Sequence, residues 1–299
     1  MNKKIRSAVF TLIAFALISS MLFACCAKKT EPEDKNDPER FISGYASFCE
    51  TAQAVLEGRE LPAHDFSYSS VPVFFARSGE KTCAYTTVGF DDRFEESEEQ
   101  YYTYYEPIAE YPKELFDMAQ DSLRKYRKQY ISPDTDEQYL SVPLKGFISE
   151  NCVAFSDVSQ NDTAVNCIFC RNDSGEWTEL NDINSVFPHR MTGFEMNGSG
   201  IGFICFYDRF LGGSETETAR KLFVFKTENG GQTWTDMGLY LPETYDPCSA
   251  CFPYSPVFDG ERGVLLVSIA FDGEVPEGLS DLVWFETADG GRSWNFKQR

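Results

Sequence analysis

The first half of the chain mixes two hydrophobic periodicities. Apolar residues recur at helical spacing in a stretch that stops at Gly58, and again over 112–130, which predicts two helices. Between them, 71–76 and 82–90 alternate apolar and polar residues around a short turn, as the two strands of a hairpin do. We therefore predict a mixed α/β region over 41–138.

From residue 139 to 299 the pattern changes to short apolar strands separated by turns rich in Gly, Asn and Asp. Three pairs of strands recur along this region, and a further strand follows each of the last two pairs. The sequence predicts strands in these stretches: 147–155, 194–206 and 257–271 for the pairs, and 222–226 and 282–286 for the single strands.

An eight-residue box follows each single strand and repeats almost residue for residue. TENGGQTW at 227–234 aligns with TADGGRSW at 287–294, and RNDSGEW at 171–177 is a shorter, degraded copy. A repeat at this spacing indicates an array of similar β units. The defining positions of the two better copies are Thr227, Asn229, Gly231, Thr233, Trp234, Thr287, Asp289, Gly291, Ser293 and Trp294.

The box resembles the Asp-box, or BNR repeat, of β-propellers in the sialidase superfamily and in photosystem assembly factors. The resemblance implies a structural role: Asp or Asn bonds the turn backbone, Gly supplies a positive φ, and Trp packs against the blade. We therefore expect a mainly β fold of Asp-box propeller-like blades, with helical elements in the N-terminal third. The chain length limits it to a small or incomplete propeller.

The N-terminus carries a positively charged start, an apolar run over 8–24, and the residues LFAC at 22–25. These residues resemble the bacterial lipobox, which predicts a signal peptide over 1–24 and palmitate-type acylation of Cys25. A membrane-spanning helix is the alternative, but the run is at the short end of the spanning range. The polar stretch 25–40 then forms a tether, and the protein is a lipoprotein on the extracytoplasmic face of the cell membrane.

The amino-acid composition limits the classes of partner that the protein is expected to bind. There are 47 acidic against 27 basic residues, a formal net charge of −20, and two histidines. This charge argues against nucleic acid, which needs clustered Lys and Arg, and it favours basic partners or cations at the surface. An acidic run over 91–99 has the density of a solvated loop, with cation binding as the alternative.

The ten cysteines leave three states open: buried thiols, disulfides and a metal site. Two C-x-x-C pairs occur. Cys167 and Cys170 lie in a predicted strand, where residues three apart point to opposite faces. Cys248 and Cys251 lie in a Pro-flanked segment that we interpret as a loop able to chelate or cross-link. We predict no metal and no cofactor.

Catalytic motifs are sparse. A sialidase needs three arginines converging on a carboxylate, and the spacing of the arginines in the repeat region singles out no such triad. We therefore expect a non-enzymatic binding module for a protein or glycan partner. The alternatives are a divergent sialidase-like glycoside hydrolase and an assembly factor for a membrane complex.

Overall fold

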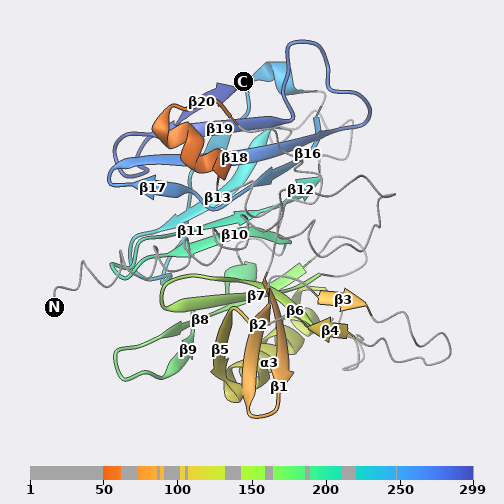
Figure 1. Ribbon diagram of the computed structural model, residues 1–299, viewed down its shortest axis with the longest axis vertical. Helices are drawn as coiled ribbons and strands as arrows, with labels where there is room; N and C mark the ends of the chain where they lie inside the picture. The colour runs from red at the N-terminus through yellow and green to blue at the C-terminus, as the bar shows by residue number, and fades with distance from the viewer. Residues whose placement is uncertain are drawn as a thin grey trace, which may run out of the picture.

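The strands of the second half carry apolar side chains on both faces, so each sheet must be covered on both sides. The computed structural model satisfies this requirement with three stacked sheets between two helices (Figure 1). The structure describes these residues: 50–61, 73–85, 88–90, 102–104, 107–131, 143–158, 164–185, 189–209, 220–246 and 248–298.

The first sheet has seven strands in the order β5-β2-β1-β6-β7-β8-β9 and curls into half a barrel. The β1–β2 hairpin joins it through the pairing of β1 with β6, so residues from both sides of the predicted boundary at 138 form one sheet. Its strands are β1 (Val73–Ser78), β2 (Lys81–Tyr85), β5 (Ala109–Pro112), β6 (Leu144–Ile148), β7 (Cys152–Val158), β8 (Ala164–Arg171) and β9 (Trp177–Glu179).

The second and third sheets repeat the antiparallel order of β6 to β9. The second runs β10-β11-β13-β14, with β15 also paired to β13, and the third runs β12-β16-β18-β19-β20, with β17 also paired to β18. The second sheet comprises β10 (Met191–Met196), β11 (Gly202–Phe206), β13 (Lys221–Thr227), β14 (Thr235–Asp236) and β15 (Leu239–Tyr240). The third comprises β12 (Asp208–Arg209), β16 (Cys248–Pro253), β17 (Val257–Asp259), β18 (Arg262–Phe271), β19 (Leu282–Thr287) and β20 (Asn295–Gln298).

Four short elements of the described residues lie outside these sheets. They are a separate ribbon of β3 (Val88–Phe90) with β4 (Tyr102–Tyr104), and the 3₁₀ turns η1 (Ile183–Ser185) and η2 (Glu243–Tyr245).

Apolar side chains interdigitate between successive sheets. On β7, Ala154 faces the second sheet while Phe155 faces the opposite way. On β18, Leu265 packs against the second sheet, and Leu266 packs on the outer side of the third sheet. Because side chains alternate along a strand, one run of apolar residues fills two cores.

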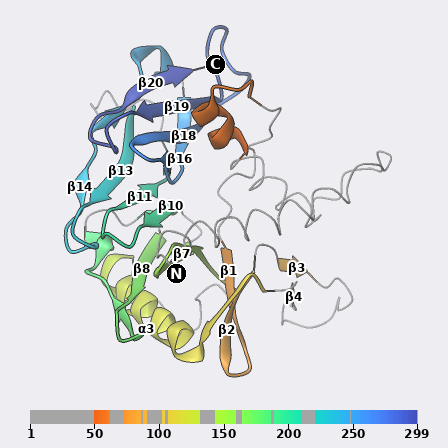
Figure 2. The ribbon, with the colours of Figure 1, turned by 60° about the vertical axis from the view of Figure 1, so that its left-hand side comes forward.

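A helix covers each end of the stack (Figure 2). Helix α3 (Lys113–Tyr130) buries Leu115, Ala119 and Leu123 against the outer face of the first sheet. The helix at 50–57 places Ala52 and Leu56 on the outer face of the third sheet. Each helix therefore covers an apolar sheet face that would otherwise be exposed to solvent.

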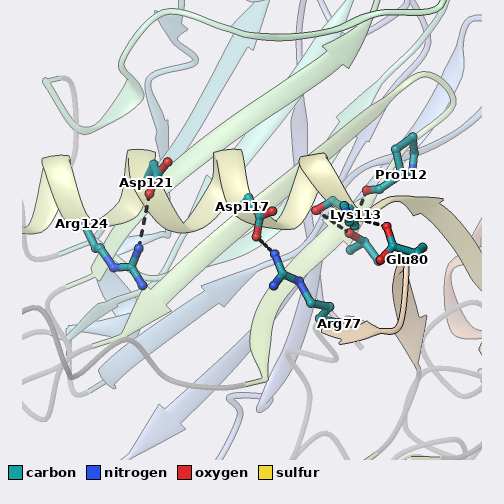
Figure 3. A network of polar contacts seen from close by, with 8 residues as sticks. Arg77, Glu80, Pro112, Lys113, Asp117, Asp121 and Arg124 are labelled. Atoms are coloured by element: carbon teal, nitrogen blue, oxygen red, sulfur yellow. Dashed lines mark hydrogen bonds and ion pairs between the residues drawn. The ribbon is translucent and has the colours of Figure 1, made fainter.

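Ion pairs attach α3 to the β1–β2 hairpin at the surface (Figure 3). Asp117 pairs with Arg77, and Lys113 pairs with Glu80, while Arg124 and Asp121 pair within the helix. Exposed pairs such as these add little to stability, so the apolar face of α3 supplies most of its attachment.

The mainly β prediction is confirmed, as is the second helix, which begins one residue later than predicted. The predicted strand 82–90 is wrong as a single element. Its first part is β2, and 88–90 form β3, which pairs with β4 instead of the sheet. No helix among the described residues is long and apolar enough to cross a membrane. The signal peptide, Cys25, the tether and the acidic run 91–99 lie outside the described residues.

Candidate functional site

The box at 227–234 forms a turn fixed by its own side chains. Thr227 Oγ1 accepts hydrogen bonds from the backbone N–H groups of Gly231 (2.9 Å) and Asn229 (3.3 Å), and it donates to Asn229 Oδ1 (2.9 Å). Asn229 Oδ1 accepts the N–H of Thr233 at 3.0 Å, while its Nδ2 donates to Thr233 Oγ1 at 2.9 Å. The side chains of Thr227, Asn229 and Thr233 are therefore used within the turn.

The box at 287–294 repeats this network with a carboxylate. Thr287 Oγ1 accepts the N–H of Gly291 at 3.0 Å and donates to Asp289 Oδ1 at 2.7 Å. Ser293 donates its hydroxyl to Asp289 Oδ2 at 2.6 Å and its N–H to Oδ1 at 3.0 Å. These hydrogen bonds, those from Ser293 first, hold the pKa of Asp289 well below its usual range.

One backbone bond ties each of the two better boxes to the turn that precedes β11 or β18. The N–H of Gly230 donates to the carbonyl of Gly200 at 2.8 Å, and that of Gly290 donates to the carbonyl of Glu261 at 2.8 Å. In the degraded copy, the N–H of Arg171 at the end of β8 donates to the carbonyl of Asn151 at 2.7 Å, which continues the pairing of β8 with β7. The two better copies therefore share this contact between turns.

The box tryptophans are half-buried. Trp294 meets Phe203 of the second sheet edge-on, with ring centroids 6.4 Å apart, and Trp234 packs on the core between the first two sheets. The glycines Gly231 and Gly291 have φ of 83° and 80°, which favours glycine. The box residues therefore connect neighbouring sheets, and the geometry gives them a structural use.

Adjacent glycines offer a test of this packing. A methyl group at Gly291 would lie 3.1 Å from the Phe203 ring and 3.3 Å from Trp294, whereas one at Gly290 meets nothing within 4 Å. Both positions have positive φ. We expect Gly290→Ala to lower the free energy of unfolding by about 1 kcal/mol and Gly291→Ala by about 2–3 kcal/mol, measured by urea denaturation. Equal losses in the two variants would contradict a packing role for the box.

A row of polar side chains crosses the first sheet on the face toward the second. Lys145 on β6 pairs directly with Ser156 on β7, and Ser156 pairs with Asn166 on β8, so the three share one face. Phe147 and Ala154, on the same face, belong to the core against the second sheet. Ser156 and Asn166 are 3% and 0% exposed. Polar residues thus occupy positions where this core is otherwise apolar.

In the described ranges, the side-chain amide of Asn166 is hydrogen-bonded through its nitrogen and not through its oxygen. Asn166 Nδ2 donates to the carbonyl of His189 at 2.9 Å, which fixes the orientation of the amide. Asn184 Nδ2 donates to the backbone carbonyl of Asn166 at 2.8 Å. Asn166 Oδ1 and the hydroxyl of Ser156 are buried and have no hydrogen-bond partner within the described part of the chain. A buried polar atom without a partner is costly, so these two atoms mark a place where a polar group would be stabilised.

A second cation, Arg190, adjoins this row. Arg190 directly precedes β10, which lies against β6. Burial, and then the positive charge of Arg190, lower the pKa of the Lys145 ammonium group. We call Lys145, Ser156, Asn166 and Arg190 the cationic cluster. Its two positive charges and the Ser156 hydroxyl can donate hydrogen bonds to an anionic group, whereas Asn166 Oδ1 can only accept one.

Sequence reasoning missed this cluster because it examined charge over the whole chain. The signal was nevertheless present: Asn166 interrupts a buried apolar strand, and Lys145 occupies an inward position beside Leu144. What the sequence does not show is that these positions, on three strands, meet in one row.

Among the described residues, the cysteines of the two C-x-x-C pairs differ in state. Cys152 and Cys170 form a disulfide across β7 and β8. Cys167 is free and faces α3, so the predicted opposite faces of Cys167 and Cys170 are confirmed. The loop interpretation of Cys248 and Cys251 is wrong, because both lie in β16, with Sγ atoms 4.0 Å apart.

No group of three or more His, Cys, Asp or Glu side chains that could hold a metal ion occurs within the ranges that the structure describes. No protein-family model matches the chain, and no curated protein matches it.

Proposed function

We propose that this protein is a lipoprotein of the Asp-box type that binds a protein or glycan partner at the extracytoplasmic face of the cell membrane. In this proposal residues 1–24 are a signal peptide, and acylated Cys25 holds the folded part to the membrane through the tether 25–40. The protein acts by binding and not by catalysis.

The strand order supports propeller-like blades. In each repeat four antiparallel strands follow one another, and the box or its degraded copy lies between the third and the fourth. A four-stranded antiparallel sheet is the unit of a β-propeller. Helix α3 and the helix at 50–57 occupy the faces where further blades would pack, which favours an incomplete propeller of three blades closed by helices.

The cationic cluster is the observation that carries the binding proposal. Two cations and two buried polar atoms gather on the face of the first sheet toward the second, in a chain whose net charge is −20. A carboxylate or other anion can accept hydrogen bonds from Lys145, Arg190 and the Ser156 hydroxyl, and bonds from the two charged groups are stronger than neutral ones. We therefore propose that the partner presents an anionic group, in contrast to the basic partner that the overall charge favours.

Binding is tested with the full chain in detergent on an array of neutral and carboxylate-bearing glycans and of acidic peptides. We expect retention of acidic probes of one of these two classes, weakened by salt, because part of the charge is exposed. Lys145→Ala is expected to reduce affinity about 10-fold or more, since a bond to a charged group contributes roughly 1.5–3 kcal/mol.

Lys81→Ala is the matched control, because Lys81 forms an exposed ion pair with Glu110 on the same sheet. Retention that is unchanged by Lys145→Ala, or is equal for neutral and acidic probes, would contradict the binding proposal. Hydrolysis of a fluorogenic sialoside panel by the same preparation would favour the sialidase-like alternative.

The anchor is tested separately by metabolic labelling of cells with a fatty acid. We expect the parent chain to be labelled and to sediment with membranes, and the Cys25→Ala variant to lose both properties, because the acyl chains attach at that sulfur. Cys26→Ala is the control. A Cys25→Ala variant labelled as strongly as the parent would exclude Cys25 as the acylated residue.

A further inference from the structure

Cys248 and Cys251 form a close pair of thiols in the core between the second and third sheets. Their Sγ atoms are 4.0 Å apart, and both residues are buried, at 6% and 2% exposure. Neither forms a disulfide with another described cysteine, unlike Cys152 and Cys170. This pair lies on a different sheet from the cationic cluster and has no part in the proposed function.

A local irregularity of β16 brings the two thiols to one face. Residues three apart in a regular strand point to opposite faces, as Cys167 and Cys170 do. In β16 the pairing with β18 shifts register between Cys248 and Ala250, and both cysteines then join the same core. A β-bulge inserts one extra residue into a strand, so two residues three positions apart can point to the same face. Cys248 and Cys251 do so here.

The Sγ–Sγ distance is short enough for a small movement to allow a disulfide bond to form. Two sulfurs in a disulfide are about 2.0 Å apart, so the Cys248 and Cys251 sulfurs must approach by roughly 2 Å. Rotation about the two Cα–Cβ bonds is the motion that changes this separation, and the strand pairing of β16 need not break. The other free thiols with resolved partners point elsewhere: Cys205 Sγ donates to the carbonyl of Tyr254 at 3.3 Å, and Cys167 Sγ donates to that of Ala119 at 3.8 Å.

The electrostatic setting distinguishes Cys248 from these buried thiols. The hydrogen bond with Cys251 lowers the pKa of Cys248, with a smaller contribution from Arg220, against the opposing effects of burial and of Asp246. For Cys167 and Cys205 burial is the largest effect, and it raises the pKa of both thiols. Because the thiolate is the nucleophile in disulfide exchange, Cys248 is the better attacking group.

We propose that Cys248 and Cys251 are an oxidisable dithiol that closes to an intramolecular disulfide by exchange with a small disulfide compound. The Cys248 thiolate attacks one sulfur of the compound and displaces the other half as a thiolate. The Cys251 thiolate then attacks Cys248 Sγ and displaces the second half. One S–S bond breaks in the compound and one forms in the protein, and the two protons of the protein thiols pass to the two released thiolates.

The test uses the full chain incubated with hydroxyethyl disulfide, then denatured with an alkylating reagent, digested with trypsin without reduction, and analysed by mass spectrometry. The tryptic peptide 227–262 contains Cys248 and Cys251 as its only cysteines. Before oxidation we expect both thiols to be alkylated. After oxidation we expect the same peptide without alkylation and lighter than the dithiol form by two hydrogen atoms.

The same digest holds an internal control. Peptide 191–209 carries Cys205 as its only cysteine, and we expect it to be alkylated in both samples. The closed form of peptide 227–262 must be absent from the Cys251→Ser variant. A parent chain in which both thiols of peptide 227–262 stay alkylatable after oxidation, or in which Cys248 is joined to Cys205, would overturn the proposal.

Discussion

Replacing Arg127 with alanine is expected to lower the free energy of unfolding by about 3–5 kcal/mol, the range found when a buried ion pair loses one partner. Arg127 on α3 donates from Nη1 to Asp157 Oδ2 on β7. The Asp157 side chain is 1% exposed and that of Arg127 is 16% exposed. The variant therefore leaves a carboxylate in the core between α3 and the first sheet without this guanidinium, and this ion pair no longer offsets the desolvation of that charge.

Arg124→Ala is the matched control for this prediction, because Arg124 lies one turn earlier on the same helix. Its pair with Asp121 has a contact of 3.3 Å, with side chains 39% and 80% exposed. An exposed pair contributes about 0–1 kcal/mol, so a change within that range is expected. Chemical denaturation of both variants measures the difference, and equal losses would show that burial of the Arg127 pair has no energetic consequence.

Leu123→Ala is expected to cost about 3–5 kcal/mol and to destabilise the sheets as well as the helix. Leu123 is fully buried in the core that α3 shares with β1, β6, β7 and β8. Truncation removes apolar contacts and leaves a cavity, because the surrounding side chains relax only in part. If α3 is a layer of the stack, its loss exposes an apolar sheet face, and helix and sheets unfold together.

Two probes distinguish this joint unfolding of helix and sheets from separate unfolding of an independent N-terminal unit. Far-UV circular dichroism follows the helix, and fluorescence follows the tryptophans, all four of which lie in the repeat region. We expect one midpoint for both probes, shifted equally by Leu123→Ala, with Gln129→Ala as an exposed control that changes little. A shift of the dichroism midpoint alone would show that 41–138 folds apart from 139–299.

Local patterns predicted most elements correctly because they depend on neighbours along the chain. Helical spacing over 112–130 reflects one buried face of α3, and the continuous apolar run over 282–285 reflects two cores on either side of β19. The strand 82–90 failed because β2 ends at Tyr85, and the pairing of β3 with β4 depends on residues beyond the pattern.

The box residues show how much of the structure a sequence motif can predict. Their hydrogen bonds lie within eight residues, so the sequence was sufficient to anticipate a side-chain-fixed turn at Thr227 and at Thr287. The contact of Trp294 with Phe203 of the neighbouring sheet depends on how the sheets stack. The motif therefore predicts the turn, and the stack determines what the turn packs against.

By itself, the sequence determined the repeat, the mainly β class, the excess of negative charge and the signals on which the proposed anchor rests. Only the tertiary structure decided that helices close the two ends of the stack, that Lys145, Ser156 and Asn166 form one row, and that Cys248 and Cys251 face each other. The physical reason is that strand register and bulges depend on pairing between distant residues, and a shift of one residue moves a side chain to the other face.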